Sequence, residues 1–553
     1  MGMGMGLGLL MAAACGSHKE TPGAGSGGGG GDMDGGASGG GAGGGGGGVT
    51  GADMDAPAAT GGAGAIGDSS SVLQRNNHAS RDGHYVQPTL TRAVAATLVL
   101  DTSFQPTITG NVYAQPLYVE QGPGGRGVFV VVTEGNNVHA VAETDGATLW
   151  TRNLGQPAAA TGAGCGNIAP DGITGTPVID LAARTIYLAA VIGNGTTILR
   201  HEIHALSLDD GSPRAGFPFD PSTVKYGDTP FVAWLQNQRG ALSLVRGTLY
   251  VPYGGHGGDC GDYRGWVIAV PLANPSGASA FFTTARGGGI WAPGGLVSDD
   301  THVWAATGNT FGATTWARGE AIIRLQAGAV FSGDKTDYFT PSNWKALDGA
   351  DADVGGTGPL LVDVPGATPS ALVVALAKNG VAYLLDRNNL GGLGTGNGIT
   401  GEGLDSKKVA TADIVNAPAT YTTAAGTYVV LRAVRPGSAA GCPAGQAGDL
   451  MGLKITATAP PTITVAWCAN NQGQGSPIVT TTDGKSEAVV WTVGAESSQR
   501  LHGFDGDTGA VVYAGGGAGD ILPKLVRRFT SPIAVKGRIV AATDNGLFAF
   551  KAP

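Results

Sequence analysis

One pattern of short apolar runs occurs eight times between about residue 90 and residue 553. Each copy opens with a small residue, usually followed by proline, and continues into a first apolar run, as in AQPLYV at 114–119. A second run (VFVVV at 128–132), a polar turn, a third run and an Asp-Gly turn lead to a fourth run. Four short strands per copy, repeated about every 50–70 residues, are typical of a β-propeller, whose loops converge on one central funnel.

The eighth copy is incomplete, because its third run, FAF at 548–550, is followed by three residues only. The run AATLVL at 95–100 precedes the first copy and can supply the missing strand. Closing a ring in this way leaves no unpaired sheet edge. We therefore expect an all-β fold over residues 76–553, an eight-bladed β-propeller of four-stranded antiparallel blades closed by an N-terminal strand.

The first 75 residues have a different composition. Residues 1–15 are apolar or small and end at Cys15, which resembles a bacterial lipoprotein signal peptide with a lipidated cysteine, although no Lys or Arg precedes the apolar stretch. Residues 16–75 are dominated by glycine, and such a chain buries too little apolar surface to offset its ordering entropy. We expect a signal peptide (1–15), a disordered tether (16–75) and a propeller (76–553), exported and lipid-anchored in the bacterial cell envelope.

The net charge and the cysteine count indicate which binding partners and which covalent links to expect. The net charge of -9, with 14% charged residues, argues against a nucleic-acid-binding protein, which would carry a basic face. No later apolar run is long enough to span a bilayer, so we expect membrane contact through the lipid only. Of five cysteines, four remain besides Cys15, an even number that suggests two disulfides in an exported protein. The pairs Cys165–Cys260 and Cys442–Cys468 would join neighbouring blades on one face, but the sequence alone does not fix the connectivity.

The fourth and fifth copies carry local motifs beyond the general repeat. Trp291 opens the stretch WAPGGLVSD, which continues into VWAATGN and ends at Asn309. Lys378 opens KNGVAYLLDR, and the acidic triplet DAD at 351–353 lies between the two motifs. These motifs and the repeats from about residue 90 to 553 resemble those of quinoprotein alcohol dehydrogenases, eight-bladed propellers that hold pyrroloquinoline quinone (PQQ) and calcium in the central funnel.

The resemblance implies a role for each of these residues. Trp291 would form the floor under the quinone, and a large flat indole suits a planar cofactor. Lys378 would contact the quinone oxygens. Asn309 would ligate calcium together with a carboxylate that also acts as the base, and both Asp351 and Asp353 are candidates for that carboxylate. Calcium prefers such oxygen ligands, and a carboxylate can take the proton of an alcohol.

Two positions depart from the family's pattern. The family's third metal ligand is a Glu just before an Arg-Gly pair, and Cys260 stands at that spacing here. Asp259 and Asp262 lie beside it, and Asp259 is the candidate that we retain as a metal ligand. The enzymes also carry two adjacent cysteines above the quinone, where this chain has only Cys165.

Two hypotheses therefore remain open. The first is a PQQ- and calcium-dependent dehydrogenase of an alcohol or sugar. It would pass electrons to a separate acceptor, because the sequence contains no Cys-x-x-Cys-His haem motif. The second is a non-catalytic propeller that binds an envelope protein or a glycan. The altered metal-ligand position favours the second hypothesis, and the spaced set of Trp, Asn, Asp and Lys favours the first.

Overall fold

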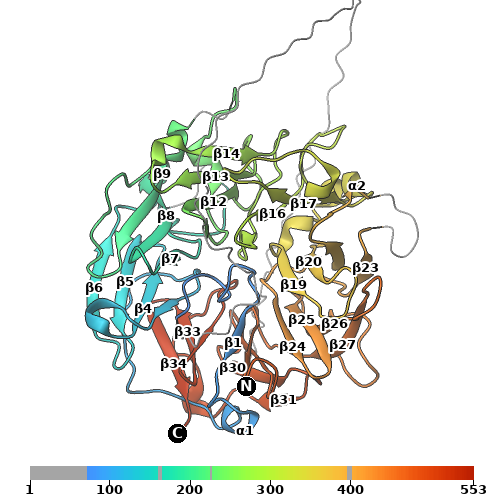
Figure 1. The fold of residues 1–553 in the computed structure, drawn as a ribbon. Coiled ribbons are helices and arrows are strands. Elements are labelled where there is room, and N and C mark those ends of the chain that lie inside the picture. The colour runs from blue at the N-terminus through green and yellow to red at the C-terminus, as the bar shows by residue number, and fades with distance from the viewer. Residues whose placement is uncertain (1–70, 160–164, 225–226, 395–401) are drawn as a thin grey trace, which may run out of the picture. The chain divides into compact units, whose positions relative to one another are not determined.

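The computed structural model describes residues 71–159, 165–224, 227–394 and 402–553. Its strands form eight sheets around a central axis, which confirms the predicted eight-bladed β-propeller (Figure 1). The predicted signal peptide, Cys15 and almost all of the predicted tether lie outside the described residues. Within the described ranges, no helix is both long and apolar enough to cross a membrane.

Each sheet is one blade, and in most blades the strands follow one another from the axis outward. Blade 1 contains β3 (Leu117–Val119), β4 (Val128–Val132), β5 (Asn137–Ala142) and β6 (Thr148–Asn153). Blade 2 contains β7 (Val178–Asp180), β8 (Thr185–Asn194) and β9 (Thr197–Ser207). Blade 3 contains β10 (Gln236–Asn237), β11 (Ser243–Val245), β12 (Thr248–Gly255), β13 (Trp266–Pro271) and β14 (Ser279–Phe282). Blade 4 contains β15 (Val297–Ser298), β16 (Val303–Thr307), β17 (Ala321–Leu325), β18 (Tyr338–Thr340) and β22 (Gly392–Leu393).

The second half of the ring is built in the same way. Blade 5 contains β19 (Leu360–Asp363), β20 (Ala371–Leu376), β21 (Val381–Asp386) and β23 (Asp405–Lys408). Blade 6 contains β24 (Ala419–Thr423), β25 (Gly426–Arg432), β26 (Leu450–Ile455) and β27 (Ile463–Ala469). Blade 7 contains β1 (His84–Val86), β28 (Ile478–Thr481), β29 (Val489–Val493), β30 (Leu501–Asp505) and β31 (Val511–Tyr513). Blade 8 contains β2 (Val99–Leu100), β32 (Ile533–Val535), β33 (Arg538–Thr543) and β34 (Gly546–Lys551). Short α-helices are α1 (Arg92–Ala95) and α2 (Trp344–Ala350).

The cores lie between neighbouring blades, because each blade packs against another sheet on both faces. All five residues of β4 are buried, which explains why its sequence is a continuous apolar run rather than an alternating one. Val130 of β4 belongs to the same buried cluster as Ile186 and Leu188 of blade 2. The continuous apolar runs of the repeat thus reflect strands that are buried on both faces of each blade.

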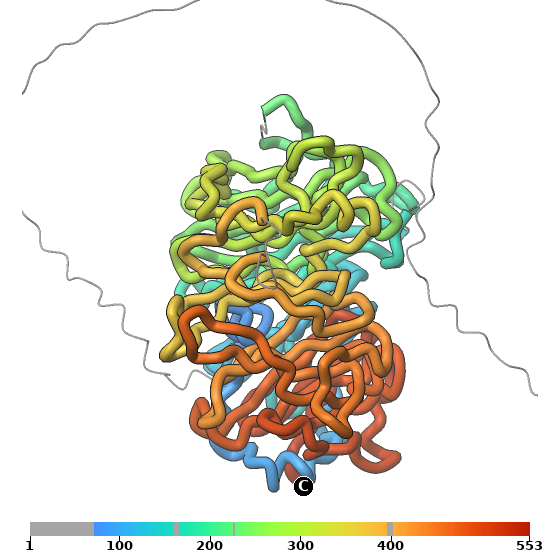
Figure 2. Tube along the Cα trace, turned by 90° about the vertical axis from the view of Figure 1, so that its right-hand side faces the viewer, coloured from blue at the N-terminus to red at the C-terminus, as the bar shows by residue number. Residues whose placement is uncertain are grey.

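The ring closes as the sequence predicts. β2 pairs antiparallel with β34, with Leu100 opposite Phe550, so the N-terminal strand completes the last blade. Figures 1 and 2 show the blue N-terminal segment beside the red C-terminal blade. Closure through this pair joins distant parts of the chain and leaves blade 8 with a full set of strands.

A segment at residues 71–87, which we call the hub loop, fills the centre of the ring. Its backbone bonds to the innermost strands of blades 1, 2, 5, 6 and 7, through Tyr118, Ile179, Leu361, Thr420 and Val479. Within the loop, the fully buried guanidinium of Arg81 donates to the carbonyls of Leu242 in blade 3 (2.6 Å) and Leu296 in blade 4 (2.9 Å).

The eighth blade is reached by a second arginine. The Arg75 guanidinium donates to the Phe529 carbonyl at 2.6 Å and to the Ser531 hydroxyl at 3.2 Å, just before β32. Burial lowers the pKa of Arg75 to about 10 and that of Arg81 to about 9. The hub loop therefore contacts every blade.

The first residue of the hub loop lies at one face of the ring. Ser71, the first described residue, accepts a hydrogen bond from the amide of Glu120, which directly follows β3. β3 is the innermost strand of blade 1, so Glu120 lies at the end of that strand. The loops that precede the innermost strands lie at the opposite face, and these are the loops that carry the predicted site.

Candidate functional site

Loops from blades 3, 4 and 5 bring the predicted site residues together. Trp291 lies in the connection from β14 to β15, and Asn309 follows β16. Asp351 caps α2 and Asp353 follows two residues later, in the connection to blade 5. Lys378 follows β20. The connections between blades lie on the same face of the ring as the loops after each blade's second strand. Trp291 and Lys378, which are 87 positions apart in the sequence, can therefore lie close together.

Asp353 is the centre of this group. Its Oδ1 accepts the backbone N–H of Asn309 at 2.8 Å, and its Oδ2 accepts the indole N–H of Trp291 at 3.0 Å. Gly308 makes this approach feasible, because a Cβ there would lie 3.0 Å from Asp353 Oδ1. The TGN and DAD motifs of the sequence are therefore one hydrogen-bonded unit in the structure.

Lys378 supplies the positive charge. Its Nζ lies 2.6 Å from Asp351 Oδ1 and 3.1 Å from Asp353 Oδ2, and 5.5 Å from the centre of the Trp291 ring. Burial alone would lower the pKa of Lys378, but the two carboxylates outweigh burial and raise it. Burial raises the pKa of Asp351, and the Lys378 ammonium opposes that effect. Lys378 is therefore a cation that neutralises two carboxylates beside an aromatic face.

Two further acidic residues, neither of them among the predicted site residues, adjoin this group. Glu320 Oε2 accepts the backbone N–H of Val354 at 2.7 Å, while its Oε1 is buried without a hydrogen-bond partner. Burial, together with the charge of Asp353, raises the pKa of Glu320 well above its ordinary value. Asp348 accepts both the amide and the hydroxyl of Thr310, and burial raises its pKa to about 6.

The loop after β12 places Asp259 near this group. Asp259 accepts the Tyr263 hydroxyl at 2.7 Å, and its pKa is raised by burial and by the charge of Asp353. The alternative, Asp262, points toward solvent with a side chain that is 68% exposed. The structure therefore brings Asp259, and not Asp262, toward the other predicted metal ligands.

Both predicted disulfides are confirmed, Cys165–Cys260 and Cys442–Cys468. The first joins the connection between blades 1 and 2 to the residue after Asp259. A backbone hydrogen bond from Gly166 to the Gly257 carbonyl (2.7 Å) reinforces this link. The bridge fixes the loop that carries Asp259.

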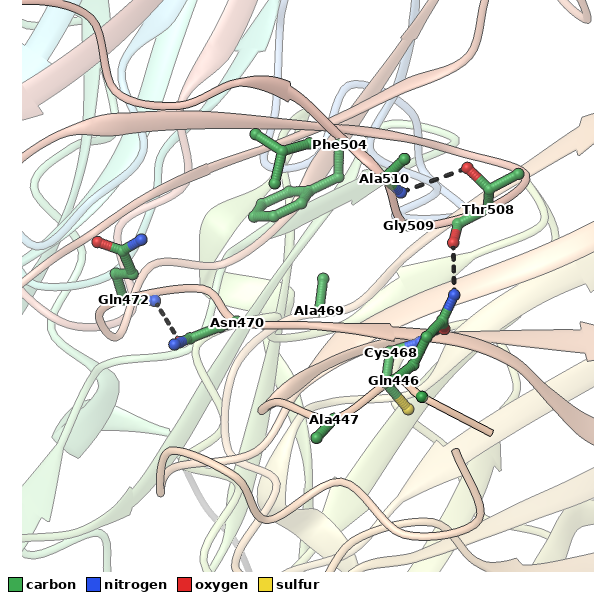
Figure 3. Close-up of a pocket in the computed structure, with 12 residues that line it drawn as sticks. Gln446, Ala447, Cys468, Ala469, Asn470, Gln472, Phe504, Thr508, Gly509 and Ala510 are labelled. Carbon is green, nitrogen blue, oxygen red and sulfur yellow. Dashed lines mark hydrogen bonds between the residues drawn. The ribbon is translucent and has the colours of Figure 1, made fainter. Parts of the chain in front are cut away.

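A cavity of about 480 Å³ lies elsewhere, between blades 6 and 7 (Figure 3). The Gln446 side chain lines the cavity and joins the two blades. Its amide nitrogen donates to the Thr508 carbonyl at 3.1 Å, and its amide oxygen accepts the backbone N–H of Cys468 at 2.7 Å. Its lining contains no charged side chain and none of the residues grouped around Asp353. No sequence motif predicts this cavity, because most of the residues that line it lie in turns and strand ends of two ordinary repeats.

Residues that sequence reasoning missed share one property. Glu320 directly precedes β17 and Asp348 lies within α2, and both are outside the sequence motifs. The one available signal was their place in the segments of blade 4 that lie on the face of the predicted site.

Comparison with known proteins supports the fold. No family model and no curated protein matches the sequence. Among solved structures, the quinohemoprotein alcohol dehydrogenase from Comamonas testosteroni is similar at a TM-score of 0.54 and 14% identity, over 87% of this chain and 80% of that one. The quinohemoprotein alcohol dehydrogenase ADH-IIG from Pseudomonas putida HK5 gives a TM-score of 0.57 at 12% identity, with the same coverage.

A europium-containing methanol dehydrogenase gives a TM-score of 0.57 at 13% identity, over 86% of this chain and 90% of that one. The chain thus has the propeller fold of quinoprotein alcohol and methanol dehydrogenases. Identities this low establish the fold and not the activity.

Proposed function

We propose that the protein is a PQQ- and calcium-dependent dehydrogenase of an alcohol or sugar, with its site around Asp353. The observation that carries the proposal is the convergence on one carboxylate of an indole N–H, a backbone N–H and an ammonium. These donors come from Trp291, Asn309 and Lys378. A plain structural propeller has no need for a buried carboxylate so surrounded.

The residues present fit the two groups. PQQ is planar and anionic, which suits the partly exposed Trp291 and the Lys378 ammonium beside it. The buried Glu320 Oε1 has no hydrogen-bond partner, and a cation would satisfy it. The described residues contain no set of three or more Asp, Glu, His or Cys arranged for a metal ion. A calcium ion here would therefore need Asp259, the Asn309 amide oxygen and oxygens of the cofactor besides Asp353.

PQQ would supply hydride acceptance, which no protein side chain offers. The chain's own residues would bind the cofactor, orient the substrate and accept the proton of its hydroxyl group. A carboxylate has about four acceptor sites, and three of those on Asp353 are used, so one remains for the hydroxyl proton of a substrate. Asp351 is engaged by Lys378 and is more exposed, which favours Asp353 over Asp351 as the base.

The disulfide Cys165–Cys260 would keep Asp259 close to the cation. The pKa of Asp259 is raised because burial and the Asp353 charge disfavour its ionised form. Calcium would reverse that effect by supplying the opposite charge. Asp259 would thus replace the family's Glu as a metal ligand.

The tether belongs to the same proposal. A lipid at Cys15 and a glycine-rich segment would anchor the protein in the cell envelope. Because Ser71 lies at the face opposite the site loops, the site would face away from the point where the tether joins the propeller. An electron acceptor in the envelope could then reach the funnel.

The test is a dye-reduction assay on the purified full chain with added PQQ and calcium and a panel of alcohols and aldoses. We expect activity in the wild type and a loss of at least about 100-fold in Asp353→Asn, the usual scale for removing a general base. Asp334→Asn is the matched control, because Asp334 is exposed on the same blade and its side chain makes no cap hydrogen bond.

Equal activity of Asp353→Asn and Asp334→Asn would contradict the assignment of the base. Absence of activity with every substrate, together with absence of PQQ binding, would favour the non-catalytic propeller. In that case the protein would act by binding an envelope protein or a glycan.

A further inference from the structure

A second polar cluster lies on the funnel face of blades 1, 2 and 3. Gly172 N, in the connection between blades 1 and 2, donates to Glu134 Oε2 at 2.8 Å. Asp171 precedes that glycine, and the Asn237 amide nitrogen lies 3.4 and 3.5 Å from its two carboxylate oxygens. Glu134 follows β4, and Asn237 belongs to β10. One short loop therefore brings together two carboxyls and an amide from three blades.

These side chains are buried, and several of their oxygens lack hydrogen-bond donors. Glu134 and Asp171 are 0% exposed and Asn237 is 3% exposed. Glu134 Oε1 and Asn237 Oδ1 have no hydrogen-bond partner. Asn136 Oδ1 is also unpartnered, and it faces the same loop, because a Cβ on Gly172 would lie 2.7 Å from it. Buried acceptors without donors are rare in folded proteins, and several in one place indicate an absent bound group.

The charges around the cluster indicate the sign of that group. Glu134 and Asp171 are two carboxyls buried in one place, and Arg239 is the nearby cation. Its single charge can balance one of the two carboxylates. His256 Nδ1 lies 3.7 Å from Asp171 Oδ2. A bound cation would balance the second carboxylate, which a water molecule would not.

We propose that Glu134, Asp171 and Asn237 form a binding site for a calcium-sized divalent cation, which ties blades 1, 2 and 3 together. The ligand atoms that these three residues offer to a metal ion are carboxylate and amide oxygens, which hard cations such as Ca²⁺ prefer. The set contains only two acidic residues and completes its ligands with amide oxygens, since the described residues hold no group of three or more Asp, Glu, His or Cys placed for a metal ion.

The site is independent of the proposed dehydrogenase. It shares no residue with the group around Asp353, and it needs no cofactor. The cation would have a structural role, because its ligands come from a loop, a strand and an inter-blade connection in three successive blades.

The test is thermal unfolding of chelator-treated full-length protein, without PQQ, before and after addition of Ca²⁺. Calcium at a large excess over its Kd is expected to raise the Tm of the wild type by about 2–4 °C. Glu134→Gln and Asp171→Asn should abolish the rise. Asp353→Asn, at the other site, should keep it.

Three results would overturn the proposal: no rise in the wild type, a rise that persists in Glu134→Gln, or a rise lost only in Asp353→Asn. The last result would put the cation beside Trp291 and would leave the proposed dehydrogenase intact. Because Glu134→Gln replaces an uncompensated carboxyl by a neutral amide, the chelated variant should unfold at or above the Tm of the chelated wild type.

A crystal soaked in a lanthanide chloride provides a second measurement that does not depend on variants. We expect an anomalous peak among Glu134, Asp171 and Asn237. A peak only at Asp353, or no peak in the funnel, would contradict the proposed site.

Discussion

At the scale of single residues, Lys378 shows how charge and position combine in this funnel. Its side chain is 15% exposed and compensates Asp353, which is 4% exposed, and Asp351, which is 31% exposed. Removing one partner of a buried ion pair costs more than the pair contributes, because it leaves the other charge without compensation. The same argument makes Lys378 more important for stability than Asp351.

We predict that Lys378→Gln lowers the free energy of unfolding by about 3 kcal/mol, the lower end for a broken buried pair. Asp351→Asn should cost less than about 1 kcal/mol, because Asp351 is partly exposed and Asp353 still pairs with Lys378. Urea denaturation measures both. The surface variant Lys485→Gln is the control, and equal effects of Lys378→Gln and Lys485→Gln would refute the ion-pair account.

A buried histidine provides a test by pH. Burial, with a smaller contribution from the Arg500 charge, lowers the pKa of His502 from 6.5 to about 4. Between these two values the unfolded chain binds a proton at His502 that the folded protein does not, so stability falls as the pH falls. The full effect below pH 4 is about 3 kcal/mol.

We therefore expect the loss of unfolding free energy between pH 7 and pH 4 to be smaller in His502→Gln than in the wild type, by up to about 3 kcal/mol. Urea denaturation at both pH values gives the difference between the two proteins, in which the contributions of other groups cancel. Identical losses in both proteins would show that His502 titrates normally in the folded state.

At the scale of elements, the hub loop is the part of the fold that no repeat explains. Its sequence from 71 to 87 is polar and aperiodic, yet Arg75, Asn76 and Arg81 are each no more than 2% exposed. Their side chains donate to carbonyls of residues just before the innermost strands, such as Leu242 and Leu296. The loop thus joins the blades at the axis through buried hydrogen bonds.

We predict that Arg81→Met destabilises the protein by about 2–4 kcal/mol, since two buried carbonyls in different blades lose their donor. Thermal or urea unfolding measures the loss. Arg126→Gln, at an exposed turn of blade 1, is the matched control and should change stability by less than about 0.5 kcal/mol. A loss below 1 kcal/mol in Arg81→Met would mean that the hub loop is not needed for the ring.

The disulfide Cys442–Cys468 closes a segment of 26 positions within blade 6. On the chain-entropy model, cross-linking a loop of this length stabilises the folded state by about 3 kcal/mol. Replacing both cysteines with alanine should therefore lower the free energy of unfolding by about that amount. Urea denaturation of the double variant, compared with the wild type under non-reducing conditions, checks this, and an unchanged midpoint would contradict it.

At the scale of the whole molecule, the sequence predicts the repeated blades but not the parts of the fold that occur only once. Four apolar runs per copy predict the blades, and the run at 95–100 predicts the closing strand, because both follow from strand periodicity and edge pairing. The convergence of Trp291, Asn309 and Asp353 follows from the shared face of their loops. The hub loop and Glu320 could not be predicted in this way, because their positions depend on contacts with several blades at once.

Equilibrium binding of PQQ to the full-length protein in the presence of calcium is the decisive test of the proposed dehydrogenase site, and calorimetry or quenching of tryptophan fluorescence measures it. We expect one calcium-dependent site of micromolar or tighter Kd, weakened at least about tenfold by Trp291→Ala, a change of ~1.4 kcal/mol. Absence of binding, or binding that Trp291→Ala and Asp353→Asn leave unchanged, would contradict it.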